Sequence, residues 1–148
     1  MRTSRSPTNL VLVAFGALLI AGGVVVTFAE LRPFLRASDT PPARMLTLAE
    51  GKTEHGFSTS ARQLFLFDCR SAIISLFARI QTEAVRRSLN QNCLSASDRL
   101  AAEQPTFSIA WLTGALAASQ LEDWDGFNLR LEHSQRTGPT EQWIAQIR

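Results

Sequence analysis

The sequence predicts an all-α protein in which one N-terminal transmembrane helix is followed by a small helical domain. Residues 10–29 form an uninterrupted apolar run. Beyond it, apolar residues recur at steps of three and four, which is the spacing of amphipathic helices. The run at 64–67 (LFLF) could start a strand, but no second segment offers it a partner. These observations predict helices throughout.

The apolar run is long enough to cross a membrane. Leu10 to Ala29 are twenty residues, and no charged residue lies between Arg5 and Glu30. At about 1.5 Å of rise per residue, such a helix matches a hydrocarbon core of about 30 Å. We assign residues 1–9 to a cytoplasmic N-terminus and residues 10–30 to a transmembrane helix. The alternative is a signal peptide cleaved after Ala29, but the apolar part of such peptides usually has only about 7–15 residues.

The orientation of this anchor rests on the cysteines. Basic residues flank both ends of the span, so the positive-inside rule does not decide. The chain has two cysteines, and both lie after the span. That pattern favours a disulfide in an oxidising compartment. We therefore expect a single-pass protein of the inner (plasma) membrane, with its C-terminal domain in the periplasm.

Residues 31–58 are predicted to be a linker. We expect Pro33 and the segment 38–42 to stop the first helix, because proline lacks the amide donor and disfavours helix in the residue before it. Residues 43–51 are expected to form one or two helical turns that end at Gly51, and residues 52–58 a loop.

Residues 59–148 are predicted to form the helical domain. Thr82 is expected to cap one helix and Pro105 to open the next. Trp124 and Phe127 are placed on the apolar stripe of a later helix. The expected helices span residues 60–78, 82–104, 105–121 and 124–136, and a last helix after Gly138 carries Trp143, Ile144 and Ile147.

The two cysteines test this layout. If helices 60–78 and 82–104 form a hairpin that turns near residue 80, Cys69 and Cys93 lie eleven and thirteen residues from the turn. They are then nearly level, as a disulfide with a Cα separation of about 5.5 Å requires. The alternative is two buried free thiols, since unpaired cysteine is common in cores.

A 34-residue spacing points to a helical repeat. Pro105 and Pro139 are 34 residues apart, which is the period of tetratricopeptide repeats. Residues 108–141 match the register of that family at Trp111, Gly114, Ala115, Leu131, Ser134 and Pro139. Phe127 departs from it, because the family usually has a small residue there. The segment resembles a degenerate, tetratricopeptide-like antiparallel helical hairpin. Such hairpins are scaffolds with a groove for peptides or helices; the alternative is an ordinary helical bundle.

Residues 124–148 also resemble the tail of small membrane-anchored helical proteins of alphaproteobacteria. Some of those proteins accompany cell-surface polysaccharide assembly. The resemblance implies an accessory role of that kind, with protein partners in the cell envelope.

Residues suited to catalysis are few. Glu122, Asp123 and Asp125 could suggest a metal, but carboxylates at a helix start are typical caps. His55 and His133 have no nucleophile at a recognisable spacing, and we expect both to be solvated. The sequence thus predicts no enzyme, no catalytic residue, no metal site and no cofactor. Fifteen basic against thirteen acidic residues give no surface for nucleic acid.

The charge is uneven along the domain. Residues 62–99 hold six Arg against three acids, and residues 103–148 hold six acids against three Arg. Solvated faces or ion pairs between these halves would explain this. The alternative is a partner-binding face formed by Arg79, Arg86 and Arg87, with Trp143 as a second contact, that meets an acidic protein, a glycan or a lipid headgroup. The sequence therefore predicts a periplasmic interaction scaffold; a structural subunit that binds mainly through its transmembrane helix is the alternative.

Overall fold

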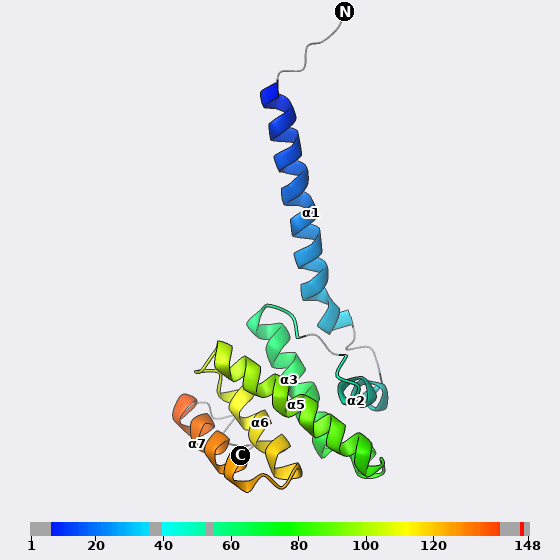
Figure 1. Ribbon diagram of the computed structural model, residues 1–148, viewed down its shortest axis with the longest axis vertical. Coiled ribbons are helices and arrows are strands. Elements are labelled where there is room, and N and C mark those ends of the chain that lie inside the picture. The colour runs from blue at the N-terminus through cyan, green and yellow to red at the C-terminus, as the bar shows by residue number, and fades with distance from the viewer. Residues whose placement is uncertain (1–6, 36–39, 53–54, 140–145, 147–148) are drawn as a thin grey trace, which may run out of the picture.

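The computed structural model describes residues 7–35, 40–52, 55–139 and 146 (Figure 1). The described residues contain no strand, so the predicted all-α class is confirmed. In chain order the helices are α1 (Pro7–Leu35), α2 (Pro41–Ala49), α3 (Thr59–Ile74), α4 (Leu76–Arg79), α5 (Glu83–Glu103), α6 (Ser108–Gln120) and α7 (Trp124–Thr137).

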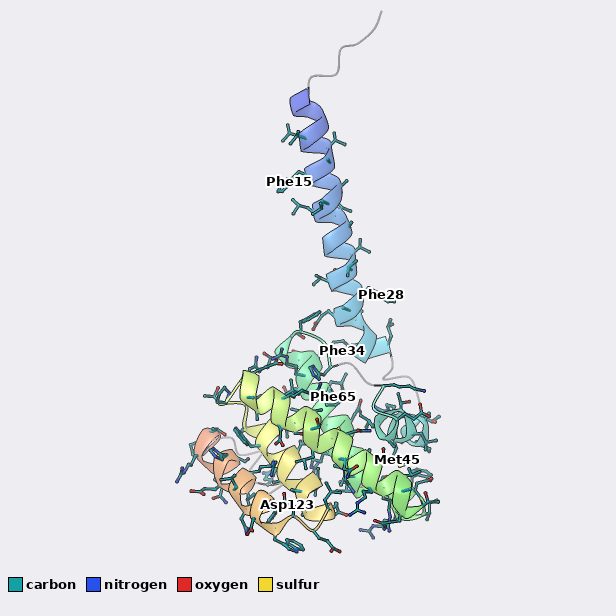
Figure 2. All side chains as sticks on the ribbon, viewed as in Figure 1. Phe15, Phe28, Phe34, Met45, Phe65 and Asp123 are labelled. Carbon is teal, nitrogen blue, oxygen red and sulfur yellow. A yellow bond between two sulfur atoms is a disulfide. The ribbon has the colours of Figure 1, made fainter. Side chains whose placement is uncertain are left out.

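Helix α1 stands clear of the domain along most of its length (Figure 1). Its segment Val11–Leu31 is long and apolar enough to cross a membrane, and none of that segment is buried against the rest of the chain. Phe15 points away from the helix with 61% of its surface exposed (Figure 2). An apolar helix left this exposed is stable in lipid rather than in water.

Pro33 does not end this helix, contrary to prediction, because α1 continues to Leu35. A proline removes a single backbone donor, so the helix can extend for the two residues that follow it. Near its end, α1 is joined to the start of α3. The Glu30 carboxylate accepts hydrogen bonds from the backbone N–H groups of Phe57 at 2.9 Å and Ser58 at 3.1 Å.

The predicted linker contains a core helix. Helix α2 begins at Pro41, two residues before the expected turns, with prolines in its first two positions. The first amides of a helix have no intrahelical partner, so prolines there cost little. Met45, Leu48 and Ala49 are buried, and α2 packs on α3 and α5. The assignment of residues 41–49 to a linker was therefore wrong.

The C-terminal end of α2 is held by α5. The Asn92 side-chain amide donates to the carbonyl oxygens of Leu48 at 3.1 Å and Ala49 at 2.8 Å. The last carbonyls of a helix need partners from outside it. The Leu48 carbonyl also accepts from the Gly51 N–H at 3.1 Å, and the Ala49 carbonyl from the Ser88 hydroxyl at 2.6 Å, so two side chains of α5 hold this end of α2. The chain then turns at Gly51, whose φ of 69° favours glycine.

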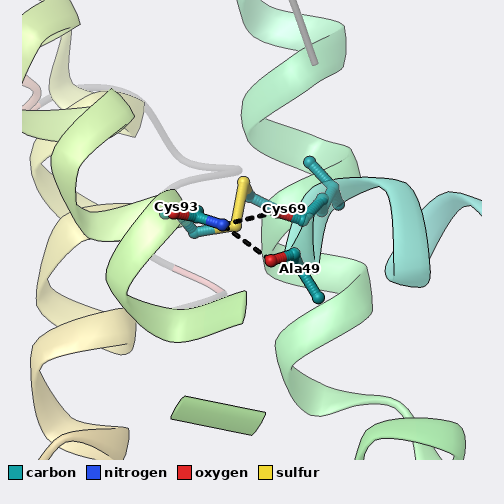
Figure 3. The surroundings of a disulfide bond; sticks show 5 residues. Ala49, Cys69 and Cys93 are labelled. Carbon is teal, nitrogen blue, oxygen red and sulfur yellow. Dashed lines mark hydrogen bonds between the residues drawn. A yellow bond between two sulfur atoms is a disulfide. The ribbon is translucent and has the colours of Figure 1, made fainter. Parts of the chain in front are cut away.

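Cys69 of α3 and Cys93 of α5 lie at disulfide distance, with Cα atoms 5.8 Å apart (Figure 3). Ala49 of α2 lies beside the pair, so three helices meet there (Figure 3). The expected closeness of the two cysteines is confirmed. Helix α5 also carries a stripe of apolar residues at steps of three and four: Val85 is partly buried, and Leu89, Cys93, Ala96 and Leu100 are buried.

The predicted helix 60–78 is interrupted at Ser75. There the backbone is extended, and the Ser75 hydroxyl accepts from the Ala78 N–H at 3.1 Å and so caps the short helix α4. Ile74 and Phe77, on either side of the break, are exposed. The break turns α4 away from the axis of α3 and leaves these side chains outside the core.

Helix α6 starts at Ser108, not at Pro105. Pro105 lies in a turn, where its carbonyl oxygen accepts a hydrogen bond from the Trp111 indole N–H at 2.8 Å. Trp124, predicted to lie on a core stripe, is 60% exposed because it begins α7 at the edge of the domain. The predicted last helix falls on residues 140–148, of which the structure describes only Gln146.

Helices α6 and α7 pack on each other. Gly114 lies where α6 comes closest to its neighbours: a Cβ added there would be 3.1 Å from Cδ of Arg130 and 3.4 Å from Cβ of Ser97. A small residue at this crossing is what the repeat register predicts. The pair α3–α5 does not repeat the arrangement, since Ser75 divides its first helix, so a tetratricopeptide-like repeat stays a hypothesis.

Candidate partner-binding site

The predicted arginine face lies where α4, the start of α5 and the end of α6 meet. Two capping hydroxyls fix this corner. Ser75 caps α4, and the Thr82 hydroxyl accepts from the Val85 N–H at 3.4 Å, as the sequence predicted for the start of α5. The short connection between these helices brings Arg79 of α4 to the same hollow as Arg86 of α5.

Two hollows share this corner. The first, here called the polar hollow, has a volume of about 270 Å³. Helix α5 supplies one wall and the end of α6 the other. Its lining residues are Glu83, Arg86, Arg87, Asn90, Gln120, Leu121 and Glu122.

The second, here called the mixed hollow, has a volume of about 130 Å³. Half of its lining residues are aliphatic, namely Ile73, Ile74, Ala78 and Leu89, and the other half are polar. Arg79 stands at its edge, and Arg86, Asn90 and Gln120 line both hollows. The two hollows are therefore neighbours that share one wall.

The charges in this corner are only partly paired. Arg86 forms an ion pair with Glu83 one turn earlier on the exposed face of α5. In the part of the chain that the structure describes, Arg79 and Arg87 have no carboxylate within ion-pair distance. Glu122 closes the turn after α6 with a φ of 61°, an uncommon conformation for a residue other than glycine. Two guanidinium groups thus remain available to an anionic group.

Asn90 is the unexpected member of the site. Only 6% of its surface is exposed, and its Oδ1 has no hydrogen-bond donor within the described structure. A buried amide oxygen without a donor is costly, because it has lost its water and gained nothing in return. Asn90 and Gln120 were missed in the sequence, where a polar residue within a helix normally indicates a solvated face.

Ion pairs between helices explain the rest of the uneven charge. Arg62 pairs with Glu103 at 2.8 Å, and Arg130 pairs with Asp98 at 2.7 Å. Both pairs join the basic stretch 62–99 to the acidic stretch 103–148. The hydrogen bond from Arg130 to Asp98 also raises the pKa of Arg130. The ion pairing between the halves that the sequence suggested therefore applies to these residues, whereas Arg79 and Arg87 take no part in it among the described residues.

Asp68 links α3 to α2 through Arg44, at 2.8 Å. Burial disfavours its charged form and raises the pKa of Asp68, while the neighbouring Arg44 opposes that shift. The pair lies beside Met45 and the core, away from the two hollows. It is a structural contact between helices.

The remaining predicted residues fall elsewhere. Asp123 accepts from the Gly126 N–H at 2.9 Å, so the expected capping role is confirmed for it. His133 stacks on Trp111, with ring centroids 4.5 Å apart, and His55 meets the ring of Phe65 edge-on at 5.7 Å. Both histidines are half-buried against aromatic rings, so the expectation that they are solvated was wrong.

Trp143, the other predicted partner contact, lies outside the described residues. Within the described ranges, no three His, Cys, Asp or Glu side chains gather in a way that could hold a metal ion.

Comparison of the chain with protein-family models, with curated proteins and with solved structures finds no match. The proposals below are therefore argued from the sequence and from the geometry of the fold.

Proposed function

We propose that this protein is a membrane-anchored periplasmic interaction scaffold, an accessory factor that binds envelope proteins through its helical domain. The observation that carries the proposal is the corner formed by α4, α5 and α6. It combines Arg79 and Arg87, which have no carboxylate partner among the described residues, with the buried Asn90 and a hollow of mixed aliphatic and polar lining. Concave surfaces where polar and charged groups converge beside aliphatic side chains are candidate binding sites.

The place of this corner supports binding to a partner rather than to the bilayer. Glu30 joins α1 to the domain at Ser58, the residue before α3. Helix α3 has 16 residues and is about 24 Å long, and Ile73 and Ile74 lie at its other end. The start of α5, drawn in green, also lies on the side of the domain away from α1 (Figure 1). Surface charges act over about 8 Å at physiological ionic strength, so headgroups around α1 are beyond the reach of these arginines.

The periplasmic location draws support from the cysteines. Cys69 and Cys93 lie at disulfide distance in the core of the domain. Disulfides persist in oxidising compartments such as the periplasm and are rare in the cytoplasm. A domain in the periplasm, with the N-terminus in the cytoplasm and α1 across the inner membrane, is the topology that we propose.

Two resemblances refine this proposal. The α6–α7 pair, with Gly114 at the crossing and Trp111 against the second helix, is compatible with a degenerate tetratricopeptide-like hairpin. The resemblance of residues 124–148 to alphaproteobacterial envelope proteins points to cell-surface polysaccharide assembly as the process served. A glycan of that process is a further candidate partner.

A structural subunit that binds through its span is the second candidate function. A Cβ added at Gly16, Gly22 or Gly23 would meet no atom within 4 Å. These glycines leave parts of α1 where the backbone of another membrane helix could approach closely.

Two chimeras separate the candidates. In the first, an unrelated single-span anchor replaces residues 1–31; in the second, an unrelated soluble domain follows residues 1–35. Each chimera and the natural protein are crosslinked in intact cells, and the captured proteins are quantified by mass spectrometry. The scaffold proposal predicts that the first chimera retains the partners and the second loses them. The reverse result would favour the span and contradict the scaffold proposal.

A further inference from the structure

We propose that Phe57, held at the end of the span by Glu30, is an interfacial anchor that inserts into the lipid headgroup layer of the bilayer. Together with Leu31 and Phe34 of α1, it keeps the beginning of α3 against the membrane surface. This inference rests on the proposed membrane anchoring and names the bilayer as a second contact of the helical domain. Three observations support it: the level of Glu30, its hydrogen bond with Phe57, and the exposure of the apolar side chains around it.

Glu30 marks the level at which the hydrocarbon core ends. The apolar run from Leu10 to Ala29 precedes it, and as a helix this run measures about 30 Å, which is the thickness of that core. The headgroup layer beyond the core is about 5–8 Å thick on each side. Because a charged group is costly in hydrocarbon, the Glu30 carboxylate belongs to the headgroup layer.

A direct contact brings Phe57 to the same level. Its backbone N–H donates to Oε2 of Glu30 at 2.9 Å, and the Ser58 N–H donates to the same oxygen at 3.1 Å. A phenyl ring stays close to its own backbone, so in any rotamer the ring of Phe57 lies within or beside the headgroup layer. Ser58 is the N-cap of α3, so the beginning of this helix is held at that level too.

The apolar side chains at this level are open to their surroundings. Phe57 has 69% of its surface exposed, slightly more than Phe15 within the span. Leu31 and Phe34 are also exposed, and Phe34 lies where α1 meets the domain (Figure 2). Glu30 and Phe34 are four residues apart, so they are neighbours on one face of α1. Side chains of a helix lean toward its N-terminus, so the ring of Phe34 leans back toward the level of Glu30.

The chemistry of this patch, formed by Leu31, Phe34 and Phe57, fits a lipid surface. Phenylalanine and leucine enter the boundary between headgroups and acyl chains, while polar neighbours stay in the hydrated layer. Thr59 and Ser60, the first residues of α3, are such polar neighbours and are exposed. The patch continues the apolar surface of α1 onto the domain, so the lipid that surrounds α1 reaches it. A domain held in this way presents its arginine corner at the other end of α3, away from the membrane.

The test measures the depth of Phe57 in the full-length protein, reconstituted into nanodiscs of phosphatidylethanolamine and phosphatidylglycerol. 4-Trifluoromethyl-phenylalanine replaces one phenylalanine at a time. Fluorine nuclear magnetic resonance then follows the relaxation caused by dissolved oxygen, which partitions into lipid, and by a water-soluble nickel chelate. Phe15 in the span and Phe77 of α4 are the references for lipid and for water, because both are exposed and they lie at opposite ends of the molecule.

The ratio of oxygen-induced to nickel-induced relaxation at Phe57 is expected to lie between those of the two references, at least about threefold above that of Phe77. Glu30→Ser keeps a polar residue at the end of the span but is too short to hold Phe57, so it should lower the ratio at Phe57 at least about twofold. Glu132→Ser is the matched control. It removes an exposed carboxylate that pairs with Arg136 on α7, and it should leave the ratio at Phe57 unchanged.

Three results would overturn the inference. A ratio at Phe57 equal to that of Phe77 would place the ring in water. A weak response to both reagents would mean that protein, such as a second copy of this chain, covers the ring. An unchanged ratio in Glu30→Ser would show that this carboxylate does not hold Phe57 in the headgroup layer. If Phe57 lies in water while the anchor-swapped chimera still captures its partners, this inference falls and the scaffold function stands; if Phe15 also lies in water, the membrane anchor falls with it.

Discussion

Helix α2 gives the sharpest test of the fold, because two neighbouring residues in it have opposite surroundings. Met45 is 1% exposed in the core, whereas Leu46 beside it is 44% exposed. Replacing either with alanine brings a similar gain in helix propensity, so the difference between the two variants isolates burial. Truncation of a buried methionine to alanine costs about 2–5 kcal/mol, and surface substitutions usually stay within about 0.5 kcal/mol.

We therefore expect Met45→Ala to lower the free energy of unfolding by about 3 kcal/mol. For a domain of this size, one kcal/mol corresponds to a Tm shift of about 4–8 °C, so the expected drop is about 12–24 °C. Thermal unfolding of the full-length protein in detergent micelles, followed by tryptophan fluorescence without reductant, measures it. Leu46→Ala should shift the Tm by only a few degrees. Equal small shifts for both variants would show that residues 41–49 are a linker after all, and would refute the packing described here.

Three further predictions concern the disulfide, a helix cap and a buried carboxyl. The free energy of unfolding of the Cys69→Ala, Cys93→Ala double variant should be lower by about 3.5 kcal/mol, because the pair closes a loop with a sequence separation of 24. Urea unfolding with and without reductant measures this difference. An unchanged free energy of unfolding would contradict a formed bond. Asp123→Ala should cost about 1 kcal/mol in the same assay, since the Gly126 N–H loses its acceptor, and an unchanged midpoint would exclude the cap. Burial raises the pKa of Asp68, so the folded protein binds the Asp68 proton more tightly than the unfolded chain does. The contribution of Asp68 to the free energy of unfolding is therefore greatest at low pH and is lost as pH rises through the folded pKa. A carboxyl titration of Asp68 with its midpoint below the ordinary value would reverse that sign.

Local signals in the sequence were enough for much of the fold. Thr82 predicted the start of α5 because a hydroxyl before an amphipathic stripe satisfies the first free amides of a helix. The positions of Cys69 and Cys93 before and after a turn near residue 80 predicted that the two cysteines lie close together, because a helical hairpin places them nearly level. The class, the apolar N-terminal helix and the stripe of α5 all follow from the spacing of residues near one another in the chain.

The predictions of helix boundaries were wrong where a residue type is compatible with two different local structures. Pro41 and Pro42 can end one helix or begin another, and only the packing of Met45 against α3 and α5 decides that they begin α2. Ser75 can lie within a helix or cap the next one, and the short helix α4 selects the cap. Such choices depend on contacts between distant segments, which spacing along the chain does not reveal.

Only part of the candidate site was predicted, because the rest of it depends on contacts between helices. Arg79, Arg86 and Arg87 stood out by charge, and all three line the corner of the two hollows. Asn90 and Gln120 carried no signal, because their importance comes from burial between helices. Gln120 belongs to a different helix from the arginines, and no local pattern links it to them.

The oxidation state of Cys69 and Cys93 in growing cells is the most direct measurement of a disulfide-paired domain outside the cytoplasm. Cells are quenched with acid, and the protein is treated with a polyethylene-glycol maleimide before or after reduction. A protein that lacks residues 1–31 and stays in the cytoplasm is the control. We predict no mass shift before reduction and two additions after it for the natural protein, with labelling before reduction for the control. Two additions to the natural protein before reduction would contradict both the bond and the proposed side of the membrane.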